Sequence, residues 1–158
     1  MGVRAMVEMR NLLPDPRATK QFGSWRCTVS GPTDGHYTYT PNDGGVGAIT
    51  IRGANPNNGL VLFAHVQCTA LNRIIFESNV QMWYGTDWCA GRIKDNPDGN
   101  TNLYLNSGSG PVTLLHAGVY TPDDWEHLYA LYQKSEIRYP WMAGPRDAAA
   151  NVPGPWEL

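Results

Sequence analysis

The sequence predicts an all-β fold, a two-sheet antiparallel β-sandwich with one short C-terminal α-helix. Along most of the chain, apolar and polar residues alternate with a period of two. Turn-forming clusters interrupt this alternation about every ten residues, which is typical of a sandwich or a barrel. One segment near the C-terminus instead repeats its apolar residues at helical spacing, which predicts the single helix.

The predicted strands are the stretches in which the alternation is clearest. They are Trp25–Ser30, His36–Thr40, Gly47–Arg52, Leu60–Thr69, Ile74–Tyr84, Thr101–Asn106 and Val112–Tyr120. The loop between two of them, Asn96 to Gly99, has Pro at the second and Gly at the fourth position of a type I turn. An early strand is also expected within "VEMRNLL", which the following "PDP" ends.

The helix is predicted over about residues 122–134. Thr121 is a favoured N-cap residue, Pro122 suits the first helical position, and Asp123 and Asp124 complement the positive end of the helix dipole. The helical stripe is aromatic and aliphatic and is most simply a packing face against a sheet; it consists of Trp125, Leu128, Tyr129 and Tyr132. We therefore expect one β-sandwich domain over residues 1–140, helix included, and a Pro/Gly-rich C-terminal tail over residues 141–158.

Composition excludes several classes of function. The chain of 158 residues has a net charge of −2 and only 16% charged residues, with no basic run, so nucleic-acid binding is not expected. No apolar run approaches the ~18 residues of a membrane span. The N-terminus is too short and too charged for a secretory signal. Three widely spaced cysteines and four scattered histidines give neither a disulfide framework nor zinc spacing.

The strongest functional signal is a predicted hairpin of the two longest strands around residues 70–72. Because register preserves faces in steps of two, one side of this hairpin is apolar and the other carries polar groups around one tryptophan. The apolar side includes Leu62 opposite Val80 and Val66 opposite Phe76. The other side holds the tentative glycan-binding residues Trp83, Gln81, Asn79, Glu77, His65, Gln67 and Phe63.

An aromatic ring among amides and a carboxylate suits a sugar, because the ring stacks on the apolar sugar face and the amides bond its hydroxyls. A second interpretation carries equal weight. Antiparallel sheets often have one wet face that binds nothing, and Phe63 and Trp83 could lie under the helix or in a subunit contact. His65 and Glu77 would then form an ordinary cross-strand contact. Elsewhere, alternation sends Tyr37 and Tyr39 to the core and Tyr104 towards solvent or a partner.

Catalysis and metal binding have little support in the sequence. The chain has no nucleophile elbow, zinc-protease motif or phosphate-binding loop. Glu77 and Asp87 could form the carboxylate pair of a glycosidase, but surface solvation explains both better. Oxygen-bearing side chains at alternate positions from Asn96 to Asn102 fit a turn better than a calcium loop. No cofactor is expected, and a structural calcium ion stays open.

Two stretches carry a resemblance to a known family. "NLLPDPRATKQFGSW", followed by "GPTDGHYTYTP", is similar to the N-terminus of carbohydrate-binding-module-like jelly-roll proteins, which occur among minor tail and virion proteins of bacteriophages of actinobacteria. Asn11, Leu12, Leu13, Pro14 and Trp25 stand in the matching places. "HAGVYTPDDWEHLYAL", followed by "PWMAGP", resembles the ending of such proteins. The resemblance implies a jelly roll, no catalysis, a virion location and homo-oligomers, and it transfers no ligand residue.

The expectation is therefore a non-enzymatic phage virion component. The first hypothesis is a minor tail protein that binds host cell-wall polysaccharide. The alternative is a structural virion protein, a capsid decoration or tail-tip subunit, whose surfaces bind other virion subunits. A glycoside-cleaving enzyme ranks third.

Overall fold

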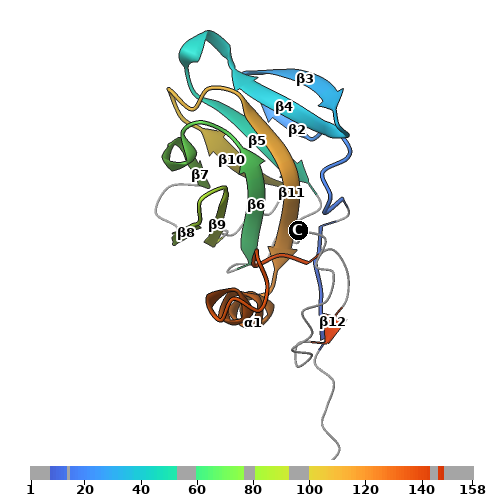
Figure 1. Cartoon of the computed structure of the whole chain (residues 1–158). Coiled ribbons are helices and arrows are strands. Elements are labelled where there is room, and N and C mark those ends of the chain that lie inside the picture. Colours follow the sequence, from blue (N-terminus) through green and yellow to red (C-terminus); the bar gives the residue numbers. More distant parts are fainter. Residues whose placement is uncertain are drawn as a thin grey trace, which may run out of the picture.

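A computed structural model describes residues 8–13, 15–52, 60–76, 81–92, 100–142 and 146–147. This part of the chain forms a sandwich of two antiparallel sheets (Figure 1). The four-stranded sheet has the order β2 (Gly23–Trp25), β5 (Gly47–Arg52), β10 (Asn100–Leu105) and β7 (Ile74–Phe76). The six-stranded sheet has the order β3 (Cys27–Thr33), β4 (His36–Pro41), β11 (Val112–Tyr120), β6 (Val61–Gln67), β9 (Trp88–Arg92) and β8 (Met82–Tyr84). The predicted two-sheet sandwich is confirmed.

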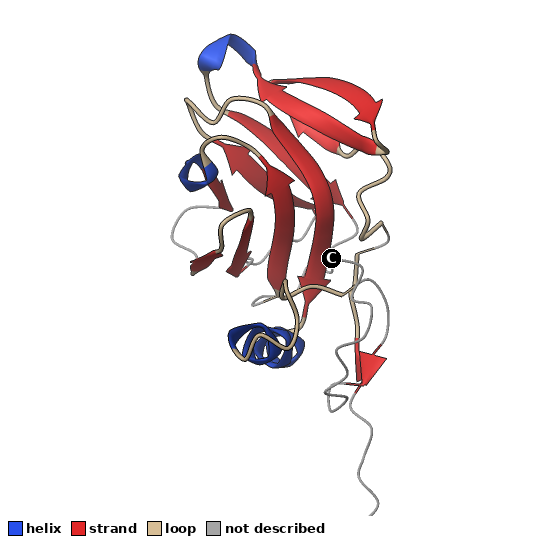
Figure 2. Ribbon diagram, in the orientation of Figure 1, coloured by secondary structure: helices blue, strands red, loops and turns tan. Residues whose placement is uncertain are grey.

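The remaining elements are short, apart from one helix. Helix α1 spans Pro122–Gln133, and single 3₁₀ turns span Asn42–Gly44 and Leu71–Arg73. Strand β1 (Glu8–Met9) pairs with β12 (Arg146–Asp147), so the early predicted strand is present in shortened form. Figure 2 shows the strands forming the body of the molecule, with α1 at the end where β6 begins and β11 ends. No helix in the described ranges is long and apolar enough to cross a membrane.

The main core lies between the two sheets and follows from the alternation along each strand. Ile49 and Ile51 of β5 and Leu103 of β10 are fully buried and belong to the same cluster as Leu62 and Val66 of β6. Tyr39 is 1% exposed in this core and Tyr37 packs against it, as predicted. All three cysteines are free thiols, and Cys89 is buried.

A second core covers the outer face of the six-stranded sheet. Because β6 alternates, Val61 and Phe63 point away from the sandwich, and both are 0% exposed beneath α1. The helix begins as predicted: the Thr121 side chain accepts a hydrogen bond from the Asp124 amide at 3.2 Å, with Pro122 in the first turn. The buried helix residues are Asp124, Trp125, Leu128 and Leu131.

Asn11 explains the structural role of the "NLLPDP" stretch. Its side-chain oxygen accepts from the amides of Leu13 and Val119, and its Nδ2 donates to the carbonyls of Ala117 and Met142. Asn11 therefore joins the N-terminal segment, β11 and the segment after α1. Leu13 then enters the main core at 4% exposure.

Several predicted strands are present, but two divide: Trp25–Ser30, and Ile74–Tyr84, whose ends form β7 in one sheet and β8 in the other. Gly47–Arg52 and Val112–Tyr120 match β5 and β11 residue for residue. The predicted strand Trp25–Ser30 instead breaks at Arg26, whose φ is +51°. The chain turns there from the four-stranded sheet into the six-stranded sheet, so Trp25 and Cys27 belong to different sheets.

The predicted hairpin of Leu60–Thr69 with Ile74–Tyr84 is wrong. Strand β6 pairs with β9 and β11, while β7 pairs with β10 in the opposite sheet. The 3₁₀ turn Leu71–Arg73 carries the chain across the sandwich instead of reversing it in one sheet. The expected partners Glu77, Asn79 and Val80 lie outside the described residues.

The segment "QMWYGTDWCAG" forms the true hairpin of this region. The amide of Gly85 donates to the carbonyl of Trp88 at 2.9 Å, which closes the turn between β8 and β9. A Cβ on Gly85 would lie 1.9 Å from the Trp88 indole nitrogen, so only glycine fits at this position. Trp88 is therefore a core residue, 2% exposed.

Candidate functional site

Of the residues predicted to bind a glycan, Phe63 and Trp83 lie on the outer side of the six-stranded sheet, and that side is covered. Register aligns Trp83 of β8 with Ala90 of β9 and then with Phe63 of β6. Trp83 is half-buried, with its ring 5.2 Å from that of Trp125 on the helix. Of the two interpretations of this face, the one that places Phe63 and Trp83 under the helix fits the structure, because Phe63 belongs to the buried cluster that contains Trp125 of α1 and Trp83 packs against it.

The other members of the predicted set are scattered. Gln67 and Gln81 are exposed, and His65 is 8% exposed. Glu77 and Asn79 lie outside the described residues. His65 contacts Asp87 and His116, and its predicted contact with Glu77 lies outside the described residues. Glycan binding by this set stays a prediction.

The outer face of the four-stranded sheet, in contrast, carries an exposed tryptophan. Ile49 and Ile51 point into the core from β5, so Ala48 and Thr50 point outward. By the same alternation, Asn102 and Tyr104 face outward from β10, as predicted for Tyr104. Trp25, on the edge strand β2, is 49% exposed.

The strand register places Trp25 and Tyr104 on either side of Ala48, which has the smallest side chain of the three. Trp25 pairs with Ala48, and Ala48 pairs on its other side with Tyr104. Ala48 is 1% exposed and lies between these two larger side chains. A hollow of about 310 Å³ opens there, lined by Trp25, Ala48, Thr50, Asn102 and Tyr104. We call this set the sheet-face hollow.

Polar groups stand in the neighbouring row of the same face. Thr50 pairs with Asn102, and its Oγ1 donates a hydrogen bond to Asn102 Oδ1 at 2.9 Å. This contact orients the Asn102 amide and leaves its Nδ2 to donate and the Thr50 oxygen to accept. The sheet-face hollow thus combines apolar ring surfaces with a donor and an acceptor.

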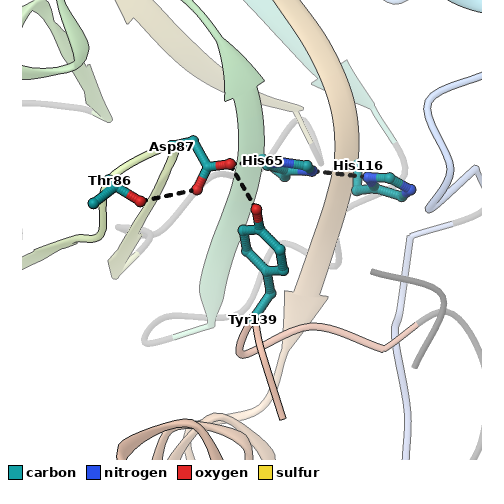
Figure 3. A network of polar contacts seen from close by, with 5 residues as sticks. All are labelled: His65, Thr86, Asp87, His116 and Tyr139. Carbon is teal, nitrogen blue, oxygen red and sulfur yellow. Dashed lines mark hydrogen bonds and ion pairs between the residues drawn. The ribbon is translucent and has the colours of Figure 1, made fainter. Parts of the chain in front are cut away.

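A polar network on the opposite sheet forms a second cluster (Figure 3). His65 Nε2 lies 3.1 Å from Asp87 Oδ2, and the Tyr139 hydroxyl donates to the same oxygen at 2.6 Å. His65 Nδ1 lies 3.0 Å from His116 Nδ1, and the Thr86 hydroxyl donates to Asp87 Oδ1 at 3.3 Å. These contacts tie the segment after α1 to β6, β11 and the β8–β9 turn.

The protonation states follow from burial and from the hydrogen bonds. Burial lowers the pKa of His65, and the Asp87 carboxylate only partly offsets this, so His65 is neutral at pH 7. Burial raises the pKa of Asp87, but the hydrogen bonds from Tyr139 and His65 outweigh it and hold this pKa below its usual value. Burial together with Asp87 raises the pKa of Tyr139 to about 12. The neutral His65 thus donates from Nε2 and accepts from His116 at Nδ1.

This network serves structure better than catalysis. Asp87 already accepts three hydrogen bonds, and both His65 nitrogens have partners. Glu77, the predicted second carboxylate of a glycosidase, lies outside the described residues. Among the residues that are described, no group of three or more His, Cys, Asp or Glu side chains is placed to hold a metal ion.

Comparison with known proteins adds a distant likeness of fold. No family model matches the chain. No curated protein matches it either. A solved structure of a mutant family 29 carbohydrate-binding module, studied for its mechanism of ligand recognition, superposes with a TM-score of 0.44. It is 14% identical, over 80% of this chain and 99% of that chain.

Proposed function

We propose that this protein is a non-catalytic carbohydrate-binding protein whose site is the sheet-face hollow. The observation that carries the proposal is the row Trp25–Ala48–Tyr104, in which two outward rings flank a methyl group. Strands lie ~4.8 Å apart, so the two aromatic residues start about 10 Å from each other across the sheet. That separation suits a sugar ring held against aromatic surface over Ala48.

The polar groups support the same class of ligand. A sugar presents hydroxyls around its rim and C–H groups on its faces, so it needs aromatic surface and nearby donors and acceptors together. Asn102 and Thr50 provide these groups one row from the rings. A nucleobase would also stack on Trp25, but a nucleic-acid backbone needs several cationic contacts, and the sequence has no basic run and the described lining of the hollow is neutral.

Substitution of Trp25 tests the site. We expect Trp25→Ala to weaken glycan binding 10- to 100-fold, because burial of an aromatic side chain contributes about 1.5–3 kcal/mol. Screening on a glycan array that includes bacterial cell-wall polysaccharides identifies a ligand, and isothermal titration calorimetry then measures its affinity for each variant. Tyr104→Ala and Asn102→Ala should weaken binding as well.

Trp83→Ala is the matched control, since it removes a tryptophan from the opposite sheet. Its affinity should equal that of the wild type wherever chemical denaturation shows the variant to be folded. If Trp83→Ala abolishes binding while Trp25→Ala does not, the ligand binds on the six-stranded sheet. If neither variant changes the affinity, the sheet-face hollow is not the site.

The biological setting is a further part of this proposal. The "NLLPDP" and "HAGVYTPDDWEHLYAL" motifs support a place in a bacteriophage virion as a minor tail protein, where a host cell-surface glycan is a fitting ligand. Mass spectrometry of gradient-purified particles should then detect the chain at a constant ratio to the major capsid protein. Recovery only in the soluble fraction of the lysate would contradict a virion location.

A further inference from the structure

We infer that the glycan bound at the sheet-face hollow is anionic and that Arg26 binds its anionic group. This inference rests on the proposed function and names the class of sugar. It starts from the position of one side chain. The Arg26 guanidinium carbon lies 4.7 Å from the centroid of the Trp25 ring, and the arginine is exposed.

The guanidinium stands beside the hollow and does not fill it. Arg26 is not among the residues that line the hollow, whereas Trp25 is. Arg26 therefore covers Trp25 surface outside the hollow, at the open edge of the four-stranded sheet. A glycan that lies over Ala48 and continues past Trp25 would bring its next unit to this arginine.

The backbone at Arg26 does not call for an arginine. Its φ of +51° lies in the left-handed region, which glycine and asparagine adopt at lower cost. The corner between β2 and β3 is tightly packed through the backbone, because a Cβ on Gly47 would lie 2.9 Å from the Arg26 carbonyl oxygen. The side chain itself is exposed and lies over the Trp25 ring.

The guanidinium also has N–H groups left for a ligand. No described acidic side chain forms an ion pair with Arg26. Arginine presents a planar fork of donors that matches a carboxylate or a phosphate with two parallel hydrogen bonds. Stacking on Trp25 holds the plane of this fork while its edges stay in solvent.

The charge of the whole face agrees with this assignment. The described outward residues of the four-stranded sheet are neutral: Trp25, Ala48, Thr50, Ile75, Asn102 and Tyr104. Arg26 stands at the β2 edge and the exposed Arg73 immediately before β7, while the exposed Asp43 follows Asn42, whose amide donates to the Arg26 carbonyl at 2.9 Å. The described lining of the hollow is thus uncharged, and Arg26 is the charged side chain that contacts its tryptophan.

Paired probes test the charge without changing the sugar backbone. Polygalacturonate and hyaluronan are each compared with their carboxyl-reduced forms, and a phosphodiester-linked teichoic acid tests phosphate as the anionic group. Wild-type protein should bind at least one acidic probe tenfold or more tightly than a neutral counterpart. Raising NaCl from 20 to 200 mM should weaken the acidic complex only, because salt screens the attraction.

Variants assign this preference to Arg26. Arg26→Ala should lose about tenfold for the acidic probe (about 1.4 kcal/mol) and leave the carboxyl-reduced probe unchanged. The affinity of Arg26→Lys for the acidic probe should lie between those of the wild type and Arg26→Ala, since lysine keeps the charge and loses the planar pair of donors. Arg138→Ala is the matched control, because Arg138 is also exposed and lies 5.4 Å from the ring of Tyr139, in the segment after α1. Its affinities for the acidic and the carboxyl-reduced probes should equal those of the wild type.

The outcomes separate this inference from the proposed function. Equal binding of acidic and neutral probes, with Trp25→Ala still weakening both, would overturn the charge assignment and leave glycan binding standing. An acidic preference that survives in Arg26→Ala would overturn the role of Arg26. If no acidic or neutral probe binds to wild-type protein, the inference and the glycan site both fail for these sugars.

Discussion

Trp125→Ala is expected to lower the free energy of unfolding by about 3–5 kcal/mol, the usual cost of removing a fully buried large aromatic side chain. Trp125 is 2% exposed at the centre of the second core. Its ring lies 5.2 Å from that of Trp83, 5.6 Å from Tyr129 and 6.3 Å from Trp88. Alanine would leave a void that these rings cannot fill without moving the helix. Urea denaturation followed by tryptophan fluorescence and far-UV circular dichroism measures the change.

Trp125→Phe separates ring packing from hydrogen bonding. The Trp125 indole nitrogen is buried and has no hydrogen-bond partner in the described structure. Phenylalanine removes this unpaired donor while keeping a ring, so it should cost less than half as much as alanine. Trp25→Ala, at an exposed position, should change stability by only about 0.5 kcal/mol or less. A loss below 1 kcal/mol for Trp125→Ala would contradict the assignment of α1 to the folded core.

The two tryptophans show why the site could be predicted only in part. Alternation along a strand assigns each side chain to a face, and it assigned Tyr104 and Trp83 to outer faces correctly. It cannot say what covers a face. The cover over Phe63 comes from a helix about 60 residues further along the chain, which the sequence predicts as a helix but cannot position.

The strand pairing failed for a related reason. Val61 to Val66 are buried without interruption, because one side packs in the sandwich and the other under α1. A strand buried on both faces has no polar side that would indicate its register with a neighbour. The pairing of β6 with β9 and β11 was therefore not evident from the sequence. Strand β9 was missed for the same reason, since Trp88 to Gly91 are all buried. The ends of β5 and β11 were nevertheless predicted correctly.

Trp25 was predicted as a strand residue but not as a site residue. A single aromatic residue at a strand end gives no functional signal by itself. Its significance depends on Ala48 and Tyr104, which are 23 and 79 positions away and become neighbours only through the pairing of β2, β5 and β10. A register of three strands cannot be deduced from alternation within each strand.

Asp87→Ala is expected to lower the free energy of unfolding by about 2–4 kcal/mol at pH 7.5, since hydrogen bonds to a charged group contribute about 1.5–3 kcal/mol each and this carboxylate is partly exposed. The substitution removes the acceptor for His65 and for the Tyr139 hydroxyl, and both of these residues are more than 90% buried. The segment Ile137–Met142 would lose a polar contact to the β8–β9 turn. Thr86→Ala is the matched control, because its longer and exposed contact of 3.3 Å should contribute little.

The pH dependence of stability tests the charges of this network, which the loss of stability in Asp87→Ala at a single pH does not. The pKa of His65 is lowered by burial in the folded state, so the unfolded chain binds more protons and stability should decline as pH falls below 6.5. Arg138 and His36 oppose a charge on His65, and His116 can share only one proton with it. The pKa of Asp87 is held below 3.8 in the folded state. A second loss of stability is therefore expected below about pH 4, as this carboxylate becomes protonated. Denaturation of wild type and Asp87→Ala between pH 3 and 8 should show the second loss in the wild type alone. Identical profiles would show that Asp87 does not stabilise this network through its charge.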